Sequence, residues 1–171
     1  MQAILGMSKS LMAASIVLAS AVTSPAWAWQ TGRMTGGGSI FCSVNDGQTS
    51  FRVTHGFELH CQPEGQSVPT PNNLEINWLG GNNFHLTALT MSLCTYQGDP
   101  SPPAADFNTM QPTGTGTLNG APASIEFTLT DFGEPGSHDF FGFRIVNAAY
   151  QAVLTCGANL DRGNQQAHNV N

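Results

Sequence analysis

The sequence predicts an all-β fold: an antiparallel β-sandwich of jelly-roll type with about eight strands, and a β-barrel as the alternative. Two observations predict it. Apolar and polar residues alternate along most of the chain, and no segment after residue 28 shows the apolar period of a helix. Turn signals such as Asn45-Asp46-Gly47 and Asn119-Gly120 separate the alternating segments. Each strand thus has one apolar face, which must be buried against a second sheet or inside a closed one.

The first 28 residues have the layout of a secretory signal peptide. They contain Lys9, an apolar run from Leu11 to Val22 that is short for a bilayer span, and the small-residue ending Ala26-Trp27-Ala28. Cleavage after Ala28 would leave residues 29–171 as a single domain with a polar C-terminal tail. We therefore expect a secreted or periplasmic protein without a membrane span.

The charge of the chain argues against polyanionic partners. After residue 28 there is no lysine, and four arginines against eleven carboxylates give a formal charge of −7. Phosphate backbones and anionic membranes attract proteins through clustered lysine and arginine. We therefore expect no binding to nucleic acid.

The expected strands alternate with glycine-, proline- and asparagine-rich turns. Gly36-Gly37-Gly38 is interpreted as a flexible lead into the first strand, and residues 161–171 as a polar tail that frays at its end. Residues 62–71 and 96–112 are interpreted as surface connections. The strands are expected at about residues 38–44, 50–61, 73–79, 84–93, 113–118, 123–131, 139–147 and 151–160.

A hairpin is predicted between residues 74 and 89. Its register can be predicted because a shift of one residue would turn every apolar side chain to the other face. A two-residue Gly80-Gly81 turn would make that shift, so we expect a three-residue loop, Gly80-Gly81-Asn82, which pairs Trp78 with Phe84. A change of apolar phase after Ala88 predicts a β-bulge there.

Four cysteines in an exported chain predict two disulfides. A hairpin centred on residues 45–47 would place Cys42 opposite a residue near Phe51, far along the strand from Cys61. We therefore prefer the pairs Cys61–Cys94 and Cys42–Cys156. A metal site made of these cysteines is disfavoured, because they occur singly and no CxxC pair exists.

Six motifs occur together along the chain: Gly32–Ser39, Val53–Cys61, Pro71–Glu75, Gly114–Gly116, Asp131–Gly136 and Asp161–His168. Together they resemble the small secreted bacterial domain that often follows a choice-of-anchor domain in cell-surface proteins. The resemblance covers nearly all of the chain after residue 28. It implies an exported β-sandwich module with no established activity, in which cysteines matching Cys61 and Cys94 are usual. Cys42 and Cys156 are both additional, which supports the same pairing.

A carboxylate-rich loop is the strongest candidate for a ligand site. Asp131, Glu134 and Asp139 fall within one glycine-containing connection, and hard cations such as Ca²⁺ prefer carboxylate and carbonyl oxygens. The alternative is a solvated turn in which Pro135-Gly136 reverses the chain. The spacing matches no defined calcium loop.

The histidines suggest a second, weaker candidate. Glu58 and His60 share the outward face of one expected strand and form a candidate surface site. His55 has the opposite parity, so we expect it to be buried, neutral and hydrogen-bonded. A metal site would require histidines among His60, His85 or His168 to converge in space.

These features predict an exported, non-catalytic binding or structural module of the bacterial cell envelope or extracellular space. A glycan or a cell-surface protein is the expected partner. A secreted hydrolase, assisted by a cation such as Ca²⁺, is the alternative. No catalytic residue is assigned, because the chain contains no GxSxG or HExxH motif.

Overall fold

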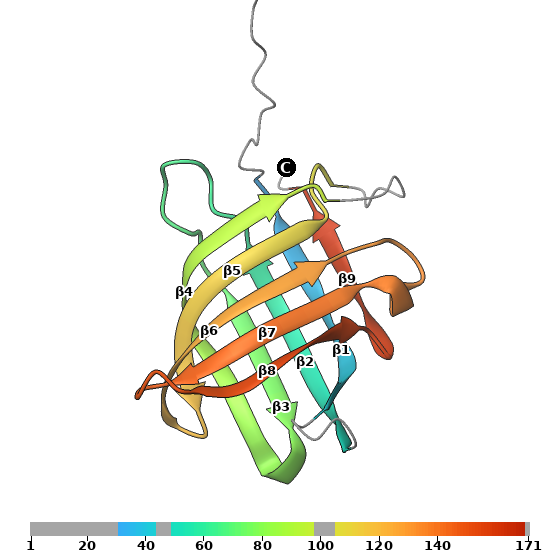
Figure 1. Ribbon diagram of the computed structural model, residues 1–171. Coiled ribbons are helices and arrows are strands. Elements are labelled where there is room, and N and C mark those ends of the chain that lie inside the picture. The colour runs from blue at the N-terminus through green and yellow to red at the C-terminus, as the bar shows by residue number, and fades with distance from the viewer. Residues whose placement is uncertain (1–30, 44–48, 98–104, 170–171) are drawn as a thin grey trace, which may run out of the picture.

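The computed structural model describes residues 31–43, 49–97 and 105–169 (Figure 1). The expected signal peptide and the Asn45–Gly47 turn lie outside these residues. Within them the fold is all-β, as predicted, with two short 3₁₀ turns, η1 (Leu79–Gly81) and η2 (Gly136–His138). The strands are β1 (Arg33–Ser43), β2 (Ser50–His60), β3 (Asn73–Trp78), β4 (Asn82–Thr95), β5 (Thr109–Leu118), β6 (Ala121–Thr130), β7 (Phe140–Asn147), β8 (Ala152–Asn159) and β9 (Arg162–His168).

The strands form one curled antiparallel sheet in the order β8-β7-β6-β5-β4-β3-β2-β1-β9. From β1 to β8 each strand pairs with the next in sequence, and β9 then returns to pair with β1. In Figure 1 strands β5 to β8 cross in front of β1 to β3. The expected jelly-roll sandwich is not confirmed, because sequential strands are neighbours in a single sheet that curls to bury its own inner face.

β8 and β9 are two parts of one bent segment. At the bend the amide of Leu160 donates to the Asp139 carbonyl and the amide of Asp161 donates to the Ser39 carbonyl, both at 2.8 Å. Before the bend the segment pairs with β7, and after it with β1. The last segment therefore brings the two ends of the meander together. It also leaves β8 and β9 as the two edges of the sheet.

Both predicted disulfides are present. Cys42–Cys156 joins β1 to β8, and Cys61–Cys94 joins the residue after β2 to β4, each with a Cα–Cα separation of 5.6 Å. The first bridge links strands that share no backbone ladder. It therefore closes the curled sheet with a covalent bond at a place where hydrogen bonds do not.

The core lies inside the curl and is built from the alternating apolar positions. Removing this apolar surface from water is the main stabilising contribution to such a fold. The largest fully buried side chains are Phe84, Phe107, Phe141, Met34, Ile40, Leu59, Leu74, Ile76, Met110, Leu129, Ile145 and Gln165.

The β3–β4 hairpin has the predicted faces but a different loop. Ile76 pairs with Phe84 and Trp78 with Asn82, so the three loop residues are Leu79–Gly81. The predicted pairing of Trp78 with Phe84 is wrong by a shift of two residues. Such a shift keeps every apolar side chain on the same face, so alternation cannot detect it. The observed loop places Gly80 and Gly81 at φ values of 81° and 76°, which glycine adopts without strain.

The bulge expected near Ala88 is confirmed by register shifts between Leu86 and Ala88 and between Leu89 and Met91.

Two expectations at the ends of the domain are wrong. The segment expected to be a polar tail without a strand contains β9, and Gly36-Gly37-Gly38 lies inside β1.

The glycines of β1 allow β9 to approach closely. A Cβ added at Gly38 would meet the carbonyl oxygen of Arg162, and one added at Gly36 would meet the carbonyl oxygen of Asn164. Glycine is therefore required here by the close approach of a neighbouring backbone.

We predict that Gly38→Ala lowers the free energy of unfolding by about 1–3 kcal/mol, because the added methyl group collides with the β9 backbone. Gly56→Ala, in β2, is the matched control, because a Cβ there meets nothing within 4 Å. The control is expected to be neutral or to stabilise by about 0.5 kcal/mol. Urea denaturation of both variants measures the difference, and equal effects would contradict the close approach of β9.

Candidate functional site

The carboxylate loop connects β6 to β7, and its first carboxylate is buried. Asp131 is only 4% exposed. Its Oδ1 accepts a hydrogen bond from the Gly133 amide at 2.8 Å, and its Oδ2 accepts one from the Ala167 amide at 2.9 Å. Oδ1 therefore makes a hydrogen bond within the loop, and Oδ2 connects the loop to β9.

Asp139 makes the same pair of contacts from the other end of the loop. This side chain is fully buried. Its Oδ1 accepts from the Phe132 amide at 2.9 Å, and its Oδ2 accepts from the Gln165 amide at 2.7 Å. The amides of Gln165 and Ala167 lie on the edge of β9 that has no neighbouring strand. The two aspartates thus supply the acceptors that a further strand would otherwise provide.

Glu134 completes the attachment of the loop to β9. Its Oε1 accepts from Asn164 Nδ2 at 2.7 Å and from Gln166 Nε2 at 3.4 Å. All three residues predicted as Ca²⁺ ligands therefore accept hydrogen bonds from β9. Within the described ranges, no group of three or more His, Cys, Asp or Glu side chains is arranged to hold a metal ion. The geometry supports a structural clamp, and calcium binding stays a prediction without structural support.

Burial perturbs one of the two aspartates. It raises the pKa of Asp139 to about 6, and the negative charges of Asp131 and Glu134 act in the same direction. The amides of Phe132 and Gln165 oppose this shift because they stabilise the ionised form. Asp139 therefore titrates close to neutral pH while holding the edge of the sheet.

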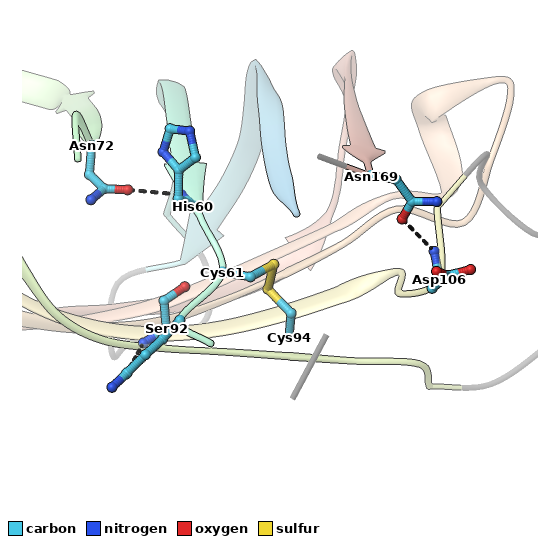
Figure 2. Close-up of a disulfide and its surroundings, with 8 residues drawn as sticks. His60, Cys61, Asn72, Ser92, Cys94, Asp106 and Asn169 are labelled. Atoms are coloured by element: carbon cyan, nitrogen blue, oxygen red, sulfur yellow. Dashed lines mark hydrogen bonds between the residues drawn. A yellow bond between two sulfur atoms is a disulfide. The ribbon is translucent and has the colours of Figure 1, made fainter. Parts of the chain in front are cut away.

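The candidate surface site at Glu58 and His60 is divided between different neighbours. Glu58 Oε1 pairs with Arg33 Nη1 at 3.1 Å, whereas His60 Nδ1 lies 2.9 Å from the Pro71 carbonyl oxygen. The His60 amide donates to Asn72 Oδ1 at 2.8 Å, and Figure 2 shows its ring pointing away from the nearby disulfide. These contacts anchor the β2–β3 connection, and they bring no third ligand-type side chain to the pair.

The other histidines do not converge with His60. His85 Nδ1 lies 2.6 Å from Glu75 Oε1 on the outer face, and His168 Nε2 lies 3.0 Å from Thr35 Oγ1. Each of the three histidines thus has its own local partner in a different part of the sheet. The histidine metal site considered from the sequence gains no support.

His55 is buried as predicted, but its environment is apolar. Its ring stacks on Phe141 with centroids 4.1 Å apart, and burial lowers its pKa to about 4. Among the described residues neither ring nitrogen has a hydrogen-bond partner, so the expected hydrogen bond is absent there. His55 is therefore a neutral core residue.

A pocket of about 470 Å³ lies beside the Cys42–Cys156 disulfide, and we call it the seam pocket. Phe51 and Trp78 reach it from β2 and β3, and β8 forms the opposite wall. Leu79 and Val153 are 68% and 45% exposed at its rim. In the part of the chain that the structure describes, its lining contains no charged side chain. The lining residues are Ser43, Phe51, Trp78, Leu79, Ala152, Val153, Leu154 and Thr155.

Sequence reasoning did not find the seam pocket. Alternation correctly placed Trp78 on the inner face of its strand, but it could not show which strand lies opposite. That depends on the bend between β8 and β9, for which the sequence has no proline or other strong signal.

Comparisons with protein-family models, with curated proteins and with solved structures found no match to this chain.

We predict that Asp131→Asn lowers the free energy of unfolding by about 1–3 kcal/mol. The substitution turns one acceptor oxygen into a donor, so the amide of Gly133 or of Ala167 is left unpaired in a buried place. Asp106→Asn, at an exposed aspartate, is the control and should change stability by less than about 0.5 kcal/mol. If the two variants unfold at the same denaturant concentration, the clamp does not stabilise the fold.

A further prediction concerns pH. Burial raises the pKa of Asp139 from 3.8 in its ordinary state to about 6 in the fold, so the fold favours the protonated side chain. The unfolding free energy gained from this preference is complete below pH 3.8 and is lost as the pH rises through 6. The unfolding free energy of the wild type should therefore fall relative to that of Asp139→Asn between about pH 4 and pH 7. Urea denaturation at several pH values measures this difference. A difference that is constant, or that changes in the opposite direction, would refute the assignment.

Proposed function

We propose that this protein is an exported, non-catalytic binding module of the bacterial cell envelope or extracellular space, and that its ligand occupies the seam pocket. The lining of that pocket is the observation that carries the proposal. Two aromatic residues, Phe51 and Trp78, line it together with Ser43 and Thr155, and none of the lining residues that the structure describes is charged. Concave sites lined mainly by apolar side chains suit small or extended ligands.

The chemistry of the pocket favours an uncharged ligand with an apolar face. A charged ligand would lose hydration there without gaining a counter-charge, which is unfavourable. An aromatic ring offers apolar contact area to such a ligand. Neutral glycans and uncharged polypeptides both have this character, in agreement with the glycan or cell-surface partner expected from the sequence.

Export is part of the proposal. Two disulfides, with no free cysteine among the described residues, favour an oxidising compartment. In the described part of the chain, no helix has the length and apolar character needed to cross a membrane. Cleavage after Ala28 and the resemblance to the domain that follows choice-of-anchor domains remain predictions.

The experiment is isothermal titration calorimetry with neutral oligosaccharides and uncharged peptides. We expect at least one of them to bind. Trp78→Ala should weaken this binding by about tenfold or more because a central aromatic contact is lost, whereas Trp78→Phe should retain most of the affinity. Melting curves check that both variants fold. Binding that is unaffected by Trp78→Ala, or no binding by any uncharged ligand, would contradict the proposal.

A further inference from the structure

The two edges of the sheet are treated differently. The free edge of β9 is covered by the carboxylates of Asp131 and Asp139. Among the described residues no carboxylate is seen to accept from the free edge of β8, whose one strand neighbour in the sheet is β7. Edge strands present unpaired backbone donors and acceptors, and natural proteins usually protect them with charge, proline or a covering segment. β8 has neither charge nor proline in its sequence, Ala-Val-Leu-Thr-Cys-Gly-Ala-Asn, and the irregularity at this edge is a register shift against β7 at Val153.

The open part of this edge coincides with the seam pocket. Residues 40–43 of β1 pair with β2 but lie beyond the end of the ladder with β9, which stops at Ser39. Ala152–Thr155 of β8 line the pocket from the other side. Backbone groups without a strand partner therefore lie on both sides of the pocket, next to its aromatic rings.

Exposed apolar side chains gather at the same place. Val153 on β8 is 45% exposed, Leu79 is 68% exposed, and both line the pocket. Phe51 and Trp78 pack against the core but are only half-buried. An additional strand alongside β8 would cover these four side chains and satisfy the open backbone groups in one step.

We propose that an extended, uncharged polypeptide segment of another protein binds here by adding a strand to the free edge of β8. This rests on the proposed function, and it names the partner class of the same pocket. Backbone amides and carbonyls of the segment pair with Ala152–Thr155, and alternate side chains enter the seam pocket between Phe51 and Trp78.

Charge determines the kind of segment. Among the described residues none that lines the pocket is charged, whereas the whole chain has a formal net charge of −6. An acidic segment would be repelled by the chain, and a basic one would leave its charge unpaired in an apolar site. The open edge is only about four residues long, so side chains in the pocket contribute a large part of the affinity.

The test uses a blocked, uncharged peptide of about six alternating valine and threonine residues, the length of an ordinary strand. The matched control is the same peptide N-methylated at alternate residues, which keeps the side chains but removes the backbone donors on one edge. Calorimetric titration of the whole protein should show that N-methylation on the binding edge weakens the interaction by about tenfold or more, the value of two lost hydrogen bonds. Equal binding by the two peptides would overturn strand addition and leave the proposed pocket function intact.

A protein variant locates the binding edge. Val153→Lys places a charge on the exposed side of β8, a natural means of blocking edge pairing, and should abolish binding of the unmodified peptide. Thr87→Lys, at an exposed site on β4, is the control and should bind as the wild type does. Peptide binding that survives Val153→Lys would overturn the assignment to β8.

Two further outcomes separate the proposals. If the peptide fails but a neutral oligosaccharide binds in a way that depends on Trp78, the further inference fails and the proposed function stands. If no uncharged probe binds, both fail. Sedimentation of the protein alone tests a second copy as the occupant. A dimer that Val153→Lys dissociates would show that β8 pairs with itself, and would overturn the proposal of a separate partner.

Discussion

The structure depends on how the buried backbone amides at the edge of its sheet find hydrogen-bond acceptors. The last segment bends at Leu160 and Asp161, so it pairs with β7 before the bend and with β1 after it. The bend exposes the amides of Gln165 and Ala167 on the side away from β1, where an unpaired buried donor would cost about 1–3 kcal/mol. Two aspartate carboxylates accept these hydrogen bonds. The acidic loop is therefore a structural substitute for a neighbouring strand.

The same bend explains the seam pocket. The ladder between β1 and β9 ends at Ser39, and further along β1 the disulfide Cys42–Cys156 links β1 to β8. The seam pocket lies next to this disulfide and is lined by residues of both strands together with Phe51 and Trp78. Carboxylates close the sheet at one end and a covalent bond closes it at the other, and among the described strands Ala152–Thr155 of β8 pair only with β7. The proposed binding function follows from that difference between the edges.

Much of this fold could be predicted from local patterns, and the remainder depended on long-range geometry. Alternation predicted the apolar faces, and the turn residues located most strands. The register of the β3–β4 hairpin was wrong by two residues, because a shift of two residues leaves every side chain on the same face. β9 was missed because its polar sequence, Arg-Gly-Asn-Gln-Gln-Ala-His, lacks strand-forming residues. The carboxylates of Asp131 and Asp139 were recognised as unusual, but their partners lie about 30 residues away in sequence, so a cation seemed the natural ligand.

Amide hydrogen exchange tests the central claim most directly. The claim is that the carboxylates of Asp131 and Asp139 act as the missing neighbour of β9. If it is correct, the amides of Gln165 and Ala167 should exchange as slowly as those of Asn164 and Gln166, which lie on the alternate positions facing β1. Slow exchange at all four positions, measured by NMR on the folded protein, is the result the account predicts. Fast exchange confined to Gln165 and Ala167, as at an ordinary open edge, would contradict it.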